Sequence, residues 1–123
     1  MKKSILLIVD DWEAHERYED FFTKHFHVTC APFAKTGFEL IQNSELQFEI
    51  ILVDLSFEDV SPLEFLQRYS KIRKHKHPKL LVILDEGGHD IREMKLLLSQ
   101  NEHLIPRPFQ WSALLNQYLL GDS

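Results

Sequence analysis

Ile5-Leu6-Leu7-Ile8-Val9 is an apolar run that stops at two acidic residues, Asp10 and Asp11. A second run of the same kind, Ile50-Ile51-Leu52-Val53, stops at Asp54. A continuous apolar run this short is typical of a strand that is buried on both faces. In an open parallel sheet, the residues that follow such strands meet in the crevice at the carboxyl ends, where ligands bind. Two such strands side by side would therefore bring three carboxylates into one pocket.

Carboxylates this close repel each other, so the pocket is stable only if a cation neutralises it or a proton is shared. Hard oxygen ligands that are few in number and leave room for water suit Mg²⁺, and Mn²⁺ is an alternative. We therefore expect a divalent metal beside Asp10, Asp11 and Asp54, and Asp54 is the candidate for chemistry. The same repulsion predicts that Asp54→Asn raises the melting temperature of the metal-free protein.

The composition indicates an ordinary globular chain. Its 123 residues fit one domain covering residues 1–123, and 44% hydrophobic with 27% charged residues favours neither a disordered nor a membrane class. The first apolar run ends at Asp10, which indicates a strand rather than a signal peptide. A net charge of -5 argues against bulk nucleic-acid binding. The single cysteine, Cys30, fits a reducing cytosol, and we expect a cytoplasmic protein in which it is a packing residue.

Strand and helix patterns alternate along the chain. Short apolar segments predict strands at residues 5–9, 27–31, 49–53, 80–84 and 103–105. Apolar residues at helical spacing predict helices at residues 13–25, 34–41, 61–72, 90–99 and 111–119. Ser61 followed by Pro62 and Glu64 is a strong helix start, and Asp90 with Glu93 repeats the capping pattern.

This alternation predicts a doubly wound, five-stranded parallel sheet with helices on both faces. Right-handed crossovers and the chain length favour the flavodoxin-like strand order 2-1-3-4-5. In that order the first and third strands are neighbours, so their terminal aspartates meet. The fourth and fifth strands end nearby, which would bring Asp85 and Arg107 to the same rim.

Three motifs occur in an order and at spacings that resemble the response-regulator receiver domain of the CheY type. They are Ile8-Val9-Asp10-Asp11, Leu52-Val53-Asp54-Leu55 and Arg107-Pro108-Phe109. The resemblance covers essentially the whole chain. It implies that the first acidic pair and Asp54 hold Mg²⁺ together with the backbone carbonyl of Ser56. It also implies that Asp54 accepts a phosphoryl group from a histidine kinase or phosphotransfer protein, with no enzymatic activity beyond self-catalysed phosphotransfer and dephosphorylation.

Several positions depart from the pattern of this family. A lysine that contacts the phosphoryl group is replaced by Arg107, which keeps the charge as a planar fork. The phosphoryl-binding Ser or Thr falls on Asp85 when counted back from Arg107, or on Leu84 when counted forward from Asp54, and neither can donate a hydrogen bond. The aromatic switch residue falls near Leu104, which has no ring.

Simpler interpretations remain open for these residues. Asp10 and Asp11 could open the first helix as an N-cap and a solvated acid. Asp85 precedes Glu86-Gly87-Gly88, which is ordinary turn chemistry. Arg107 could be an ion-pair partner of the acidic cluster rather than a phosphoryl contact. The departures also favour an alternative function, a pseudo-receiver that binds partners without phosphorylation.

The expected partner surface is the region of His103, Leu104 and Trp111. Tryptophan is favoured at binding hot spots, although Trp111 could equally belong to the core. The resemblance adds weight, because receivers commonly dock through their last two helices and the strand between them. We expect protein partners there, with no direct contact to nucleic acid or membrane.

Overall fold

The computed structural model describes residues 2–56, 60–73, 78–85 and 90–120, and these contain one five-stranded parallel sheet. The strands are β1 (Lys3–Val9), β2 (Phe26–Ala31), β3 (Ile50–Asp54), β4 (Lys79–Leu84) and β5 (Glu102–Pro106). Their order across the sheet is β2-β1-β3-β4-β5. The predicted strand order 2-1-3-4-5 is therefore confirmed.

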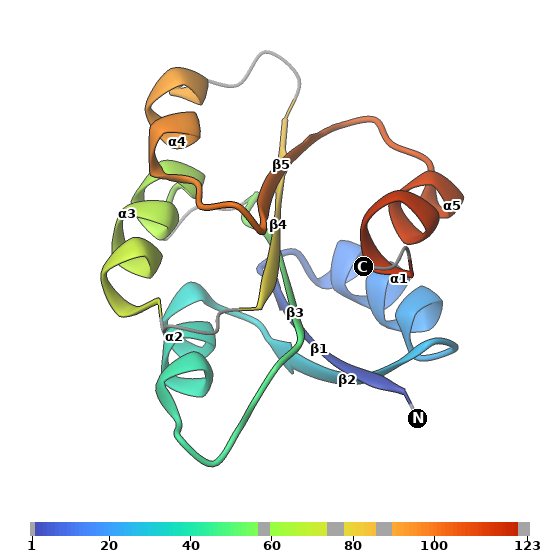
Figure 1. Cartoon of the computed structure of the whole chain (residues 1–123). Helices are drawn as coiled ribbons and strands as arrows, with labels where there is room; N and C mark the ends of the chain where they lie inside the picture. The colour runs from blue at the N-terminus through green and yellow to red at the C-terminus, as the bar shows by residue number, and fades with distance from the viewer. Residues whose placement is uncertain (1, 57–59, 74–77, 86–89, 121–123) are drawn as a thin grey trace.

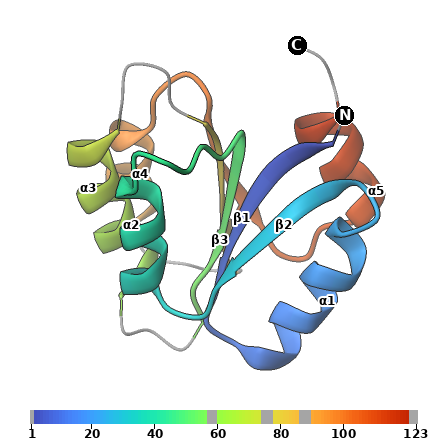
Figure 2. The same cartoon turned by 90° about the horizontal axis from the view of Figure 1, so that it is seen from below.

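Helices cover both faces of this sheet. They are α1 (Trp12–Phe22), α2 (Ala34–Gln42), α3 (Pro62–Ile72), α4 (Ile91–Leu97) and α5 (Trp111–Leu114), which continues as the π-helical turn η1 (Leu115–Leu119). Helices α2, α3 and α4 lie on one face, and α1 and α5 lie on the other (Figures 1 and 2). The predicted layers are therefore confirmed.

The central strands β1, β3 and β4 are mostly apolar because both of their faces are covered. Residues Ile5 to Val9 of β1 are at most 1% exposed. Leu6 and Ile8 pack into the hydrophobic cluster under α2, α3 and α4, whereas Leu7 packs into the cluster under α1 and α5. Successive side chains of a strand point to opposite faces, so each face needs its own apolar set. This double requirement produces the continuous run seen in the sequence.

Helix α2 lies unusually close to β1. A Cβ atom built on Gly37 would lie 2.5 Å from Cδ1 and 2.8 Å from Cγ1 of Ile8, which is completely buried. Any side chain at position 37 would therefore have to displace a packed core residue.

The two predicted capping patterns have different outcomes. Ser61 caps α3 as expected, because its side chain accepts a hydrogen bond of 3.1 Å from the backbone N–H of Glu64. Asp90 precedes α4 but makes no side-chain capping bond. Its φ of 69° places it in the left-handed region rather than the extended region of a capping residue. The predicted helix start is therefore confirmed, since Asp90 stands at the N-cap position of α4, but the side-chain capping bond is absent.

Some helix ends also differ from the prediction. Helix α1 ends at Phe22 rather than at residue 25, and α4 ends at Leu97 rather than at residue 99. The Glu86-Gly87-Gly88 turn proposed after Asp85 lies outside the described residues. Within the described part of the chain, no helix is long and apolar enough to span a bilayer.

Candidate functional site

The predicted acidic residues lie at the carboxyl ends of the central strands, but Asp10 does not line the pocket there, and among the described residues the three carboxylates are not drawn together as closely as a metal site requires. β1 and β3 pair with Val9 opposite Asp54, which places the residues after Val9 beside the end of β3. The backbone N–H of Asp10 donates to the carbonyl of Asp54 at 3.4 Å. A pocket of about 420 Å³ opens here. It is lined by Asp11, Ala14, Arg17, Tyr18, Asp54, Ser56, Asp85, Arg107, Pro108, Phe109 and Trp111.

Asp54 is the most deeply buried acid of this site, with 2% of its surface exposed. Its Oδ2 accepts a hydrogen bond of 2.7 Å from the hydroxyl of Tyr18. Its Oδ1 accepts a hydrogen bond of 3.2 Å from Ser56 Oγ and forms an ion pair with Nη2 of Arg107. The carboxylate is therefore held on both oxygens, and it has a cation beside it.

Arg107 joins two carboxylates. Its Nη2 pairs with Asp54, and its Nη1 pairs with Asp85, whose side chain is 69% exposed. Burial lowers the pKa of Arg107, but the hydrogen bond and charge of Asp54, with smaller contributions from Tyr18 and Asp85, raise it above its ordinary value. The guanidinium is therefore charged near neutral pH.

The structure distinguishes Leu84 from Asp85, the two candidates for the position that holds Ser or Thr in receiver domains. Leu84 is 6% exposed and packs in the core, while its carbonyl accepts a hydrogen bond of 2.9 Å from the backbone N–H of Arg107. Asp85 lines the pocket and contacts Arg107. Of the two residues, Asp85 is thus the one whose side chain faces the site.

The side chains of Asp10 and Asp11 both accept hydrogen bonds from backbone N–H groups. Asp10 Oδ1 accepts a bond of 2.7 Å from the backbone N–H of Ser56, which ties the end of β1 to the loop after β3. Asp11 Oδ1 accepts a bond of 3.2 Å from the backbone N–H of Glu13 and caps α1. The capping role weighed from the sequence is therefore real for Asp11, and it uses one carboxylate oxygen.

The donor set fits Mg²⁺ by its chemistry. The three carboxylates and the backbone carbonyl of Ser56 are hard oxygen ligands of the kind that Mg²⁺ prefers. The positive charge next to Asp54 is supplied here by Arg107. A divalent cation would therefore compete with this guanidinium for the same carboxylate.

Tyr18 is a site residue that the sequence interpretation missed. Its position on the apolar face of α1 indicated a core residue, and its ring is indeed buried at 4% exposure. Burial and the neighbouring charge of Asp54 raise the pKa of Tyr18, so its hydroxyl stays a hydrogen-bond donor. A buried tyrosine hydroxyl usually has a polar partner, which is the signal that could have identified it.

The expected partner surface is divided in the structure. Trp111 is half-buried and its ring packs against Tyr18, Phe21 and Phe109 at centroid distances of 5.1, 4.9 and 5.5 Å. His103 packs against Tyr118 at 5.1 Å. Leu104 packs against the cluster on the opposite face of the sheet. These residues do not form one continuous patch because adjacent strand residues point to opposite faces.

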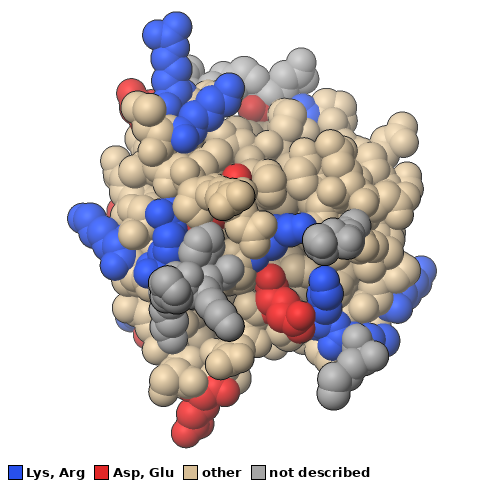
Figure 3. Space-filling model, viewed as in Figure 1, with Lys and Arg blue, Asp and Glu red and all other residues tan. Residues whose placement is uncertain are grey.

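On the face seen in Figure 3, no cluster of charged side chains among the described residues marks a further binding surface. Lys and Arg side chains there are dispersed among acidic and uncharged residues rather than gathered together.

No protein-family model and no curated protein sequence matches the chain. Several solved structures do have a similar fold. Full-length FixJ from B. japonicum superposes with a TM-score of 0.76 at 19% identity, over 97% of this chain and 57% of FixJ. A CheY-like response regulator receiver domain from Methylobacillus flagellatus gives 0.73 at 15% identity, over 93% of both chains. Adenylate cyclase from Rhodopirellula baltica gives 0.73 at 19% identity, over 97% of this chain and 88% of that one. At these identities the likeness establishes the fold, and one fold can carry different functions.

Proposed function

Because the chain has the fold of CheY-like receiver domains, we propose that it is a receiver module of a two-component phosphorelay. Asp54 accepts the phosphoryl group with Mg²⁺, and the module then acts by binding a protein partner. The observation that carries this proposal is the position of Asp54, at the end of β3 beside Asp10 and with Arg107 on its carboxylate. The donor would be a histidine kinase or phosphotransfer protein, and the proposed location is the cytoplasm.

The chemistry fits the residues of this pocket. Phosphoryl transfer depends mainly on positioning and on neutralising charge. Asp54 supplies the nucleophilic oxygen, and the hydroxyl of Tyr18 fixes the orientation of its carboxylate. Arg107 supplies charge-assisted hydrogen bonds of the kind that hold phosphoryl oxygens. Mg²⁺ bound by Asp10, Asp11, Asp54 and the carbonyl of Ser56 would supply further positive charge.

A second candidate function is a pseudo-receiver that binds its partner without phosphorylation. One observation favours it: Arg107 and Tyr18 already engage both oxygens of Asp54, and Asp85 engages Arg107. In that case the network is a structural ion pair that stabilises the carboxyl end of the sheet. The two functions differ in whether a phosphoryl group can displace Arg107 from the carboxylate.

Incubation with acetyl phosphate and Mg²⁺, followed by intact-mass spectrometry, distinguishes the two. The receiver function predicts one phosphoryl adduct on the wild type and none on Asp54→Asn. Beryllofluoride with Mg²⁺ should raise the melting temperature of the wild type only. If neither reagent modifies the wild type, the pseudo-receiver is the better description.

Asp85 should weaken phosphorylation because its charge opposes that of the phosphoryl group. Two unit charges ~6 Å apart at an effective dielectric of ~20 repel by about 3 kcal/mol. Asp85 is largely exposed and paired with Arg107, so we expect a net effect of roughly 1 kcal/mol, or about fivefold. Asp85→Thr should therefore increase the phosphorylated fraction, and Asp85→Asn should do so partly. Equal fractions in all three proteins would show that Arg107 fully offsets this charge.

The metal assignment has its own test. Calorimetric titration with Mg²⁺ or Mn²⁺ should detect millimolar or better affinity in the wild type. Asp11→Asn should weaken it, because a ligating oxygen is replaced by an amide. Equal binding by both proteins, or none by either, would contradict the assignment.

A further inference from the structure

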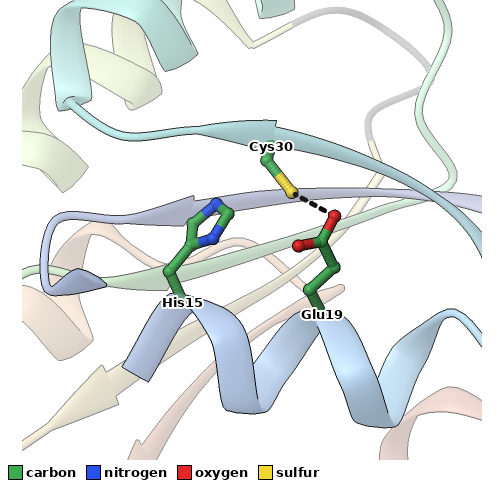
Figure 4. Close-up of side chains that lie close together, drawn as sticks. All are labelled: His15, Glu19 and Cys30. Atoms are coloured by element: carbon green, nitrogen blue, oxygen red, sulfur yellow. Dashed lines mark hydrogen bonds between the residues drawn. The ribbon is translucent and has the colours of Figure 1, made fainter. Parts of the chain in front are cut away.

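A second group of ligand-forming side chains lies between α1 and the edge strand β2. His15 and Glu19 stand one turn apart on α1, and Cys30 comes from β2 (Figure 4). One ligand atom from each residue lies within 4.8 Å of the other two. Figure 4 shows the three side chains pointing toward one another, with Cys30 Sγ donating a hydrogen bond of 3.8 Å to Glu19 Oε2. None of the three lines the Asp54 pocket.

The fold holds these residues together for reasons that do not depend on a metal. Residues four apart on a helix share one face, so His15 and Glu19 are neighbours on the same side of α1. Cys30 is fixed by the pairing of β2 with β1, in which it stands opposite Leu7. His15 is 9% exposed and stacks on the ring of Trp12 at 5.9 Å, so its imidazole is held in place. Two of the three ligands thus come from rigid surroundings, and only Glu19 is exposed.

Imidazole nitrogen, carboxylate oxygen and cysteine sulfur form a donor set that is typical of Zn²⁺. Bond lengths of about 2.0–2.3 Å in a tetrahedral site bring ligand atoms to roughly 3.3–3.8 Å from one another. The observed limit of 4.8 Å is about 1 Å wider. A change of rotamer at Glu19, which is free to move at the surface, can supply much of that closure.

The thiol is not an alternative nucleophilic centre. Burial, followed by the charge and hydrogen bond of Glu19, raises the pKa of Cys30 to about 11. Reactive cysteines have lowered pKa values and cationic surroundings, which is the opposite of the surroundings here. The thiolate is also the form that binds a metal, so Zn²⁺ would have to displace the proton of Cys30.

We propose that His15, Glu19 and Cys30 bind one Zn²⁺ ion, with a water molecule in the fourth position. The sulfur and nitrogen donors separate this site from the oxygen-only set at Asp54, because they disfavour Mg²⁺. The ion would fasten α1 to the edge strand. Since α1 also carries Tyr18, it would fix the helix that holds the Asp54 carboxylate. The proposal does not depend on phosphorylation of Asp54.

Titration of the full chain with Co²⁺, a spectroscopic substitute for Zn²⁺, tests the site. Cys30 is the only cysteine, so a thiolate-to-Co²⁺ charge-transfer band can arise from no other residue of a monomeric chain. We expect this band and the visible absorption of tetrahedral Co²⁺ to saturate at one equivalent. One equivalent of Zn²⁺ should abolish both, whereas an excess of Mg²⁺ should leave them unchanged.

Variants assign the ligands. Cys30→Ser should lose the charge-transfer band, and Glu19→Gln, an exposed and conservative change, should bind Co²⁺ at least tenfold more weakly. His27→Gln, at an exposed position on the same strand, is the matched control and should bind like the wild type. Thermal melts without metal show that each variant is folded. The proposal is overturned if the wild type gives no charge-transfer band, if Glu19→Gln binds normally, or if His27→Gln loses binding.

Discussion

Arg107→Met removes the cation that balances the carboxylates of the pocket while keeping a long side chain. Asp54 would then be left as a buried charge with 2% exposure, beside Asp10 and without its ion-pair partner. Charge centres ~4 Å apart at an effective dielectric of ~20 attract by about 4 kcal/mol. Breaking a buried pair from one side typically costs 3–5 kcal/mol. Because the Arg107 side chain is 30% exposed, water offsets part of this loss, and we expect destabilisation by about 2–3 kcal/mol.

Urea denaturation in EDTA at low salt, followed by circular dichroism, measures this loss. For a chain of this length, a loss of about 2–3 kcal/mol corresponds to a melting temperature roughly 8–12 °C lower. Added Mg²⁺ should stabilise Arg107→Met more than the wild type, because the guanidinium no longer competes for Asp54.

A double-mutant cycle with Asp54→Asn isolates the pair. The sequence predicts that Asp54→Asn alone is stabilising, but the structure reverses that expectation. Arg107 already neutralises the carboxylate, which also accepts hydrogen bonds from Tyr18 and Ser56. We therefore expect Asp54→Asn to cost about 1–2 kcal/mol, and Arg107→Met in that background to cost less than about 1 kcal/mol. Equal costs of Arg107→Met in both backgrounds would refute the reasoning.

Three further changes test other contacts by the same unfolding measurements. Burial and Asp54 hold the pKa of Tyr18 above its ordinary value of about 10, so its contribution is complete below that pH and is lost as the pH rises above it. Tyr18→Phe should accordingly flatten the alkaline loss of stability, and an unchanged slope would contradict this. Arg73→Met leaves Glu102, whose side chain is 0% exposed, without its salt bridge of 2.8 Å and should cost about 2–4 kcal/mol. Adding Glu102→Gln should recover part of that loss; no recovery would assign the cost to lost packing. Gly37→Ala would stabilise an open helix by roughly 0.5–1 kcal/mol, but contact with Ile8 should make it destabilising by about 1–3 kcal/mol. A higher melting temperature for Gly37→Ala would show that α2 moves away from the sheet at little cost.

The sequence could predict the sheet because burial on both faces leaves a direct signature. The apolar runs ending at Val9 and Val53 identified β1 and β3, and the strand order followed from chain length and crossover handedness. The same reasoning placed the terminal aspartates together, since parallel strands end at one edge.

The atoms that each side chain contacts were mostly beyond the sequence, because they depend on rotamers and on packing between distant segments. No periodicity shows that the hydroxyl of Tyr18 reaches Asp54, or that Arg107 spans two carboxylates. The proximity of Cys30 to α1 depends on the register of β2 against β1. The missing side-chain bond of Asp90 goes with the left-handed backbone angle of that residue, which the capping pattern does not reveal.

The contact between Tyr18 and Trp111 makes the fluorescence of Trp111 a probe of the Asp54 site. The hydroxyl of Tyr18 touches Asp54, while its ring meets the indole of Trp111 edge-on, at 5.1 Å and an angle of 72°. The emission of Trp111 is therefore coupled through one aromatic ring to whatever engages the carboxylate. Trp12, which is 71% exposed, stands outside this contact and stacks on His15 instead. Two tryptophans with such different surroundings let one fluorescence spectrum separate events at Asp54 from events at the surface.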